Sequence, residues 1–345
     1  MSIMTVCGPV AADKLGVVTP HEHVYIDMRV FFAPSPRIEL KQIGESKVTM
    51  DLLGLLSRNP FLVKDNVIME DRATQTAELM RFRYAGGETV VDATTIGLGR
   101  DAELLRKTAV DTGLNIIAGA GYYVEPSQSE EVKQLSIAQI QANIIKELTV
   151  GIDHTNIRAG IIGEIGISHE MMPFEEKSLR GACRAQLETN APLMIHINPW
   201  STEGLSAMAV VKEEKVNPER VVICHIDVEN RYDYIKELLD DGVYIEFDNF
   251  GKEMFMDHWD IVPGSGRFVT DWERVLLVKR LIDEGYGKQL LLSCDVCLKS
   301  SLCAYGGWGY EHVLVHIVPM LKEVGVTDEQ IDLMLIENPR RWLVP

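Results

Sequence analysis

The sequence has little cysteine, little positive charge and no long apolar segment, and each shortage narrows its possible functions. Six cysteines in 345 residues do not form the dense pattern of a disulfide-stapled protein, so we expect reduced thiols. Lys and Arg total 34 against 51 Asp and Glu, which gives a formal net charge of -17. A charge this negative disfavours nucleic acid and anionic membrane surfaces as partners. A small-molecule substrate is the remaining expectation.

The apolar segments are also too short for a membrane protein. No stretch approaches the roughly 18 apolar residues of a transmembrane helix, and the opening MSIMTVCGPV lacks the features of a signal peptide. We therefore expect a cytoplasmic protein. Hydrophobic residues make up 46% and charged residues 25%, as in an ordinary globular protein. Because no repeat or linker-like segment interrupts the chain, we predict a single domain over residues 1–345.

Eight short apolar runs predict β-strands. They cover residues 16–24, 88–95, 115–123, 159–168, 191–198, 220–227, 243–250 and 289–296. Helix-like stretches lie between them, and several end at glycine, as helix C-caps do. Strands that are apolar on both faces and alternate with helices predict an α/β protein, a (β/α)8 TIM barrel. A doubly wound open sheet is the alternative, but no G-x-G-x-x-G motif follows the first strand.

Two segments outside this alternation carry their own signals. Residues 24–87 are too long for a plain loop, so we expect a helix near TMDLLGLLSRN and a cover over part of the barrel mouth. Near the end of the chain, Thr327 and Gln330 form a capping-box pattern that predicts a helix start. Pro339 predicts that this helix stops near Asn338.

The motif PHEHVYID, residues 20–27, places His21 and His23 two positions apart at the end of the first predicted strand. Side chains at i and i+2 of a strand point to the same face, so both imidazoles can bind one cation. The alternative is a histidine pair without a metal. Partners from other strands must decide between the two readings.

Ionisable residues close several other predicted strands. The carboxyl ends of the strands carry the active site in TIM barrels, and burying such residues within apolar strands would otherwise be unfavourable. With His21 and His23, four histidines and two carboxylates would meet at one mouth, enough ligands for two divalent ions. The added residues are Glu164 on strand four, His196 on strand five, His225 on strand six and Asp295 on strand eight.

These motifs resemble the phosphotriesterase family of the amidohydrolase superfamily, and the likeness runs almost end to end. The segments RVLLVKRLIDEGYGKQLLLSCD, GGWGYEH and ENPRRWL look most like the phosphotriesterase-related branch. The resemblance implies two ions. His21, His23 and Asp295 would hold the more buried one, His196 and His225 would hold the more exposed one, and Glu164 would bridge both.

Two positions depart from the phosphotriesterase pattern. Glu164 stands where phosphotriesterases proper use a carboxylated lysine, and Asn249 stands where they have a histidine thought to move protons. Efficient phosphotriester hydrolysis is therefore not expected. Zn²⁺ is the default metal for this ligand set, although Mn²⁺, Co²⁺ and Fe²⁺ also accept it.

The expected reaction is attack by a metal-bridging hydroxide on an ester, lactone or amide carbonyl, or on a phosphoester, of a small molecule. Asp295 would move the proton from the nucleophile to the leaving group. Asp227 is a candidate relay, or else a cap for the next helix. Either Tyr122 or Tyr123 could steady the polarised oxygen, or each could simply pack the barrel rim.

Substrate contacts are expected from the loops at the mouth, although each residue has a plainer role as packing or surface charge. The expected contacts are Tyr122, Asn249, Arg267, Lys299 and Trp308. Strand alternation predicts that Cys224 and Cys294 point outward to the helices as buried thiols, beside His225 and Asp295.

Three other functions compete with this hypothesis. One is an amidase acting on a small N-acyl compound, which shares the same metal ligands. Another is a catalytically silent barrel that binds a small molecule, and the last is a mononuclear deaminase-type barrel, against which Glu164 argues because strand four would then supply no ligand. A homodimer is compatible with this size of enzyme, but no stretch identifies an interface.

Overall fold

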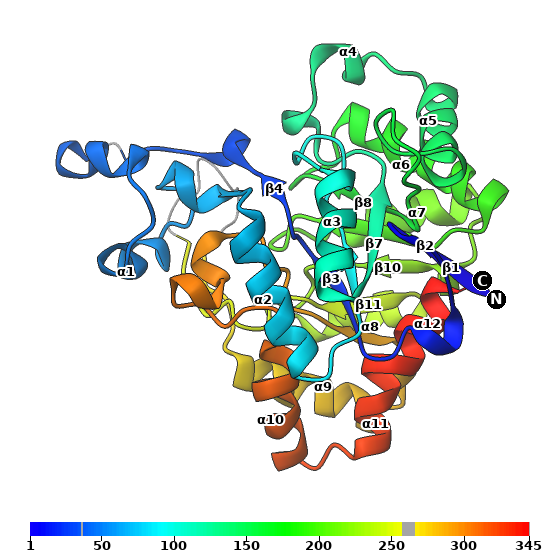
Figure 1. The fold of residues 1–345 in the computed structure, drawn as a ribbon. Helices are drawn as coiled ribbons and strands as arrows, with labels where there is room; N and C mark the ends of the chain where they lie inside the picture. The colour runs from blue at the N-terminus through cyan, green and yellow to red at the C-terminus, as the bar shows by residue number, and fades with distance from the viewer. Residues whose placement is uncertain (36, 257–265, 345) are drawn as a thin grey trace.

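A computed structural model shows eight parallel strands in a nearly closed barrel with helices around it (Figure 1). The structure describes residues 1–35, 37–256 and 266–344. Each predicted strand segment contains one barrel strand, so the TIM-barrel prediction is confirmed. In sheet order these strands are β3 (Val18–Glu22), β6 (Thr89–Asp92), β7 (Asn115–Ala120), β8 (Ile161–Ile167), β9 (Leu193–Ile197), β10 (Val221–Ile223), β11 (Tyr244–Phe247) and β12 (Leu290–Leu292).

Helices follow the strands and cover the outside of the barrel (Figure 1). Several begin at a side-chain cap, such as Asp71 before α2 and Ser136 before α5, which satisfies backbone N–H groups that have no helical partner. The α-helices are α1 (Leu53–Leu56), α2 (Arg72–Tyr84), α3 (Ala102–Thr112), α4 (Glu130–Lys133), α5 (Ile137–Thr149), α6 (Pro173–Thr189), α7 (Glu203–Glu213), α8 (Tyr232–Asp240), α9 (Asp271–Asp283), α10 (Val318–Glu323), α11 (Asp328–Asp332) and α12 (Asn338–Leu343).

The strands bury both faces, as their sequences predict. In β10, Val221 and Ile223 pack in the layer between strands and helices, whereas Val222 packs inside the barrel. The inner layer also contains Ile3 and Trp342, from the two ends of the chain. Figure 1 shows why, since the hairpin of β1 (Ser2–Thr5) and β2 (Gly8–Ala11) and helix α12 lie at the same end of the barrel as both termini.

The C-terminal helix runs further than the sequence predicts. The capping box of Thr327 and Gln330 is confirmed at the start of α11. The expected stop near Asn338 is wrong, because a π-helical turn, Leu333–Glu337, leads directly into α12 with Pro339 in its first turn. Proline is tolerated there since its missing N–H would have no helical partner anyway.

The part of the long segment between β3 and α2 that contains α1 lies at the opposite end of the barrel from the termini (Figure 1). Among its described residues, one pair of strands forms a ladder, the short antiparallel pair of β4 (Ile26–Asp27) and β5 (Ile68–Met69). Phe31 and Phe61 of this segment line the large cavity described below, which confirms that it covers part of the mouth. Across the described residues, no helix is both long enough and apolar enough to span a membrane.

The seam between the first and last strands is closed by side chains, since no strand ladder joins β3 to β12 in the described residues. The buried carboxylate of Glu22 accepts hydrogen bonds from the backbone N–H groups of Cys294 (3.1 Å) and Val296 (2.8 Å). Ser293 Oγ donates to the carbonyl of His21 at 2.6 Å and accepts from its N–H at 3.0 Å. Glu22, between the two motif histidines, therefore ties the strand that carries them to the strand that precedes Asp295.

Substituting Glu22→Ala should lower the free energy of unfolding by about 3 kcal/mol, because two buried N–H groups lose their acceptor. Glu22→Gln, which keeps one acceptor oxygen, should lose less. Urea unfolding of both variants beside the wild type measures the effect. Equal unfolding midpoints for the alanine variant and the wild type would show that the seam does not depend on this carboxylate.

Candidate active site

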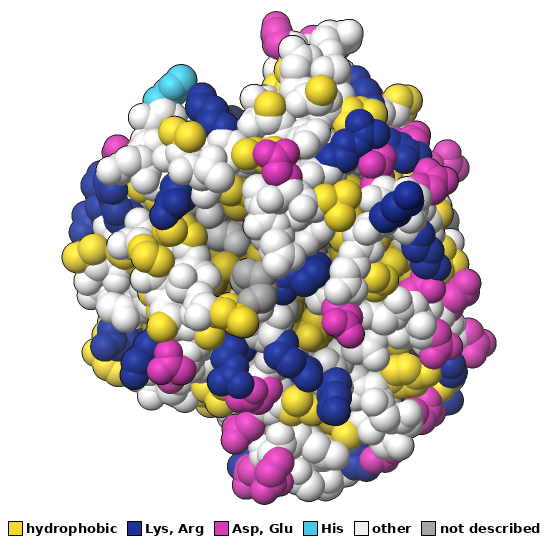
Figure 2. Space-filling view, turned by 90° about the vertical axis from the view of Figure 1, so that its right-hand side faces the viewer, with side chains coloured by type: hydrophobic (Ala, Val, Ile, Leu, Met, Phe, Trp, Pro, Cys, Tyr) yellow, Lys and Arg dark blue, Asp and Glu magenta, His cyan; other side chains and the backbone are white. Residues whose placement is uncertain are grey.

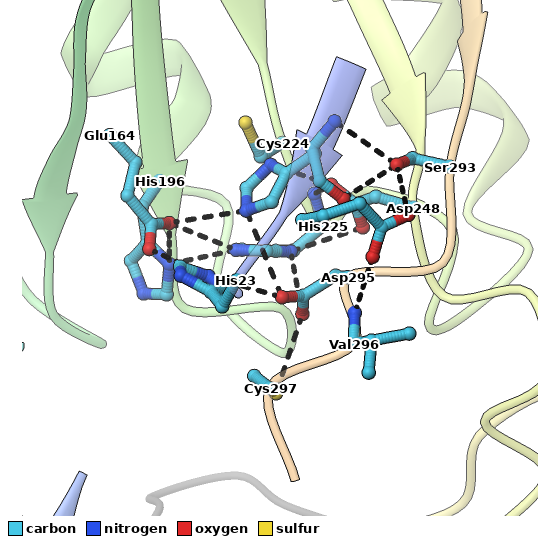
Figure 3. A network of polar contacts seen from close by, with 12 residues as sticks. His23, Glu164, His196, Cys224, His225, Asp248, Ser293, Asp295, Val296 and Cys297 are labelled. Carbon is cyan, nitrogen blue, oxygen red and sulfur yellow. Dashed lines mark hydrogen bonds and ion pairs between the residues drawn. The ribbon is translucent and has the colours of Figure 1, made fainter. Parts of the chain in front are cut away.

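Ionisable side chains from several strands meet at the carboxyl ends of the barrel strands, and Figure 3 shows His23, Glu164, His196, His225 and Asp295 among them. His23 Nε2 lies 3.4 Å from Glu164 Oε1 and 3.3 Å from Asp295 Oδ1. On the other side of Glu164, its Oε2 lies 3.1 Å from His196 Nδ1 and 3.5 Å from His225 Nε2. The glutamate is thus in the middle of the cluster, with histidines on both sides. The six residues brought together are His21, His23, Glu164, His196, His225 and Asp295.

The centre of this cluster fits a cation. Within the described structure, His21 Nε2 and Asp295 Oδ1 are buried without a hydrogen-bond partner, and they lie 3.8 Å apart. Buried polar atoms without partners are unfavourable, and a metal ion between imidazole nitrogen and carboxylate oxygen would satisfy both. Three groups of buried ligand atoms in the described structure have the spacing of a metal site, and two of them belong wholly to this cluster: His21 with His23 and Asp295, and His21 with Glu164 and His225. The third joins His21 to Cys224, Glu246 and Asp248.

Three of the four histidines have a second partner that turns their Nε2 atoms inward. His21 Nδ1 lies 3.0 Å from Glu246 Oε2, and His225 Nδ1 lies 3.0 Å from Asp248 Oδ1. His23 Nδ1 lies 2.8 Å from Thr94 Oγ1. Partners of this kind fix ring orientation and tautomer in metal sites. Glu246, Asp248 and Thr94 were not among the residues expected at the site.

A signal for two of these partners was present in the sequence. Glu246 and Asp248 are two positions apart at the end of the seventh strand, so alternation places them on one face, as it does His21 and His23. Both are fully buried. The seventh strand supplies no expected metal ligand, yet it has two carboxylates on its inner face. This pattern indicates that the carboxylates form hydrogen bonds to ligands on other strands.

The backbone leaves the strand conformation where two of the six residues project. His225 has φ +59° and Asp295 has φ +45°, the left-handed region that non-glycine residues rarely adopt. Such strain concentrates at functional sites.

The prediction that Cys224 points outward is wrong, because Cys224 packs inside the barrel with its Sγ 3.3 Å from Glu246 Oε2. Cys294 does pack in the outer layer, as predicted.

The carboxylates dominate the charge of the cluster. Burial raises the pKa of Glu164, but hydrogen bonds from His196, His225 and His23 outweigh burial and hold that pKa well below its usual range. Burial lowers the pKa of His23, yet the neighbouring carboxylates of Asp295 and Glu164 raise that pKa to about 10. The buried carboxylates therefore require positive charge around them, which protons or metal ions can supply.

Lys252 is a member of the site that the sequence analysis missed. It follows β11, is buried, and its Nζ donates to Asp295 Oδ2. Burial lowers the pKa of this lysine, but the charge of Asp295 raises it further, so that the net shift is upward. No strand periodicity reaches Lys252, since it lies five residues beyond the end of β11, and the sequence therefore gave no direct signal.

A cavity of about 620 Å³ opens beside the cluster. His196, His225, Asp295 and Lys252 lie at its polar end, and its other walls are mainly apolar. Those walls include Met28, Phe31, Phe61, Val124, Trp200, Met254, Met256 and Phe268. A volume of this size suits a small-molecule ligand.

Tyr123 lines the cavity beside the cluster. Its hydroxyl lies 3.3 Å from His196 Nε2 and 3.4 Å from His196 Nδ1, and its ring meets the imidazole edge-on with 4.7 Å between centroids. The hydroxyl is therefore next to the polar end of the cavity. Of the two tyrosines considered from the sequence, this one is placed to meet a substrate oxygen.

Four of the expected substrate contacts are absent from the described cavity lining. Tyr122 alternates away from Tyr123 and its hydroxyl accepts a hydrogen bond from Asn143 of α5 at 2.9 Å. Trp308 stacks on His312, with ring centroids 5.1 Å apart, and is half exposed. Both aromatic residues pack against helices rather than facing the cavity.

The two expected basic contacts are held by acidic neighbours. Arg267 is exposed and pairs with Glu273 near the start of α9. Lys299 pairs with Asp65, which ties the segment after β12 to the segment after β3. Arg267 and Lys299 are thus structural or surface charges, which is the alternative role considered for them from the sequence.

Asp227 and Asn249 are joined in one buried chain of hydrogen bonds. Asn249 Nδ2 donates to Asp227 Oδ1 at 2.7 Å and to Asp248 Oδ1 at 2.6 Å. Asp227 also pairs with the buried Arg274, with Nε 3.1 Å from Oδ2. Asn249 lines the cavity whereas Asp227 lies behind it, so the interpretation of Asp227 as a cap for the next helix does not hold.

Comparison with known proteins places this arrangement in a family. The sequence profile of the phosphotriesterase family matches residues 1–343. The chain belongs to the phosphotriesterase family. The resemblance drawn from the motifs is thereby confirmed, and with it the expectation of a metal-dependent hydrolase.

Several members of the phosphotriesterase family are close in sequence and in structure. A phosphotriesterase-related protein of Nematostella vectensis is 37% identical over 344 residues, covering 98% of this chain and 97% of that protein. The N-acetyltaurine hydrolase of Homo sapiens is 33% identical over 345 residues, covering 99% and 97%. The crystal structure of a resiniferatoxin-binding protein from Rhodobacter sphaeroides superposes with a TM-score of 0.96 at 36% identity, covering 99% and 94%.

Substituting Lys252→Met should destabilise the metal-free protein by about 3 kcal/mol, because a buried charge pair is broken and Asp295 is left without its cation. Affinity for divalent ions should rise in the same variant, since a competing positive charge has been removed. Urea unfolding after chelation and a metal titration measure the two effects. The exposed pair of Lys236 and Asp240 provides the control, and Lys236→Met should change neither quantity measurably. Unchanged stability in the Lys252 variant would contradict this account.

Proposed function

We propose that this chain is a dinuclear metal-dependent hydrolase that cleaves the amide bond of a small N-acyl compound, with esters and lactones as related carbonyl substrates. In this proposal His21, His23 and Asp295 would hold one divalent ion, His196 and His225 would hold the second, and Glu164 would contribute to both. The observation that carries the proposal is the convergence of these six side chains around two buried atoms that lack partners.

When bound, a pair of divalent ions would supply a nucleophilic water at neutral pH and would polarise the substrate carbonyl. The carboxylate of Asp295 would take up a proton from the nucleophile and return it to the leaving amine. Lys252 holds Asp295 Oδ2, which leaves Oδ1 directed at His23. Tyr123 donates its hydroxyl hydrogen to the developing oxyanion, since it lies at the polar end of the cavity.

Asn249 and Asp227 act as positioning residues in this proposal. The amide of Asn249 donates to both Asp227 and Asp248, and Asp248 in turn orients His225. A side-chain amide does not titrate in the physiological range, so Asn249 cannot pass a proton as an imidazole would. We therefore infer that Asp227 supports Asn249 and is not a proton relay, and that phosphotriester hydrolysis is inefficient.

The choice of an amide substrate is supported by relatives named N-acetyltaurine hydrolases in several vertebrates, including Homo sapiens at 33% identity. The apolar walls of the cavity have room for an acyl group, while Lys252 offers a positive charge near the reacting centre. The predictions of Zn²⁺, a single domain over residues 1–345, a homodimer and a cytoplasmic location belong to this proposal as well.

A second candidate function is binding of an apolar small molecule without catalysis. The observation that favours it is the close structural match to a protein named for binding resiniferatoxin. The mainly apolar cavity suits such a ligand. Retention of all six expected metal ligands favours the hydrolase instead, because pure binding of an apolar molecule does not require them.

Metal analysis of the Glu164→Gln variant tests the dinuclear proposal. The wild type, reconstituted with Zn²⁺ or Mn²⁺, should bind about two ions per chain, and the variant about one, because a neutral amide is a poor bridge. The kcat/KM of the variant should fall at least about 100-fold. A variant that keeps full activity with one ion would show that the bridge is not needed.

A substrate panel tests the chemistry with the reconstituted wild type. We expect turnover of N-acyl amino sulfonates or N-acyl amino acids, weaker turnover of lactones and esters, and little turnover of phosphotriesters. The Tyr123→Phe variant should lose mainly kcat, since its hydroxyl acts on the transition state. Two bound ions without turnover of any member of the panel would favour the binding function.

A further inference from the structure

A second large cavity lies at the opposite end of the barrel from the ionisable cluster. Its volume is about 750 Å³, and it is formed by the loops that lead into β9, β10, β11 and β12 together with the end of α12. It is separate from the substrate cavity, and the proposed reaction assigns it no role. The residues that define it are Lys215, Glu219, Arg220, Tyr244, Lys288 and Arg341.

The lining of this cavity is basic in a chain with a net charge of -17. Among the described lining residues there are four Lys or Arg side chains and one carboxylate, that of Glu219. Figure 2 views the face that bears the two termini and shows several Lys and Arg side chains in its central and lower parts. A local concentration of positive charge on an acidic protein attracts anions to that place.

These cations are not neutralised by neighbouring carboxylates. Arg220 donates to the backbone carbonyls of Arg341 (3.2 Å) and Asn190 (3.0 Å), and Arg341 donates to the carbonyl of Lys288 (2.9 Å). Lys215 and Lys288 are exposed, and neither forms an ion pair with a described residue. Carbonyl oxygens accept hydrogen bonds but leave the positive charge in place.

Arg220 is the clearest sign that a partner is missing from this cavity. Its side chain is 8% exposed, and within the described structure its Nε is buried without an acceptor. The buried Arg274, by contrast, pairs with the carboxylates of Asp227 and Asp271. Burying an uncompensated guanidinium is unfavourable, so its retention points to a counter-ion.

We propose that this cavity is a binding site for a small molecule that carries a phosphate group. Two guanidinium groups and two ammonium groups are the side chains that bind phosphate oxygens best, and the phenol of Tyr244 adds a hydrogen-bond donor at the same wall. The volume is within the range of small-molecule sites. This proposal does not depend on the proposed hydrolase activity, since the two sites share no residue.

Calorimetric titration of the metal-loaded protein with inorganic phosphate tests the proposal, at constant ionic strength against chloride. The exposed residues Lys288 and Arg341 allow substitution without disturbing the core. In Lys288→Gln and Arg341→Gln, phosphate should bind about tenfold more weakly or worse, because each removes one charge-assisted hydrogen bond. Lys107→Gln on α3 removes the same charge elsewhere and should change the affinity less than about twofold.

The titration distinguishes phosphate binding in this cavity from phosphate binding at the metal centre. Phosphate bound only to the metal ions would be unaffected by Lys288→Gln and Arg341→Gln, and that result would overturn the proposal. Equal weakening by all three variants would also overturn it, since it would show a general charge effect. Hydrolytic activity should be unchanged in the three variants, so failure here is distinguishable from failure of the proposed reaction.

Discussion

Two buried carboxylates, Glu164 and Asp295, impose the charge balance that the rest of the site satisfies. A carboxylate removed from water must be matched by positive charge or by hydrogen-bond donors. Histidines from three strands and Lys252 supply that match, and the histidines are in turn held by Glu246, Asp248 and Thr94. The arrangement is thus one connected electrostatic unit, and no member of it can be altered without affecting the others.

The same unit is joined to the closure of the barrel. Glu22 lies between the two motif histidines but faces the seam, where it holds the backbone on both sides of Asp295. The first and last strands therefore meet at the point where their ligands are presented. Correct barrel closure and correct placement of His21, His23 and Asp295 are one structural event, which explains why a carboxylate is buried in the middle of a histidine motif.

The sequence predicts most of this architecture because strand alternation is a strong constraint. All eight strands and all six cluster residues follow from apolar runs and from the polar residues that end them. Alternation no longer predicts the direction of a side chain where the backbone leaves the strand conformation. Cys224 faces inward because it continues the alternation of Val222 and Ile223, and it is His225 that leaves the alternation at a positive φ. Lys252 reaches Asp295 from a loop with no periodicity.

Other failures have a different physical origin. The roles of Arg267, Lys299 and Trp308 depend on which neighbours reach them from distant parts of the chain, and a single sequence does not encode those pairings visibly. Pro339 was expected to end a helix, but proline is also found in the first turn of a helix, which is its position here. Only the backbone conformation before the proline distinguishes these two cases.

The wall of the substrate cavity and its polar floor come from different parts of the fold. Phe31 and Phe61 belong to the segment between β3 and β6, whereas the ionisable cluster is fixed by the barrel strands. Changes in that segment can therefore reshape the cavity while the ligand set stays intact. Substrate preference can therefore change during evolution through substitutions in this one segment, while the residues that carry the reaction stay the same.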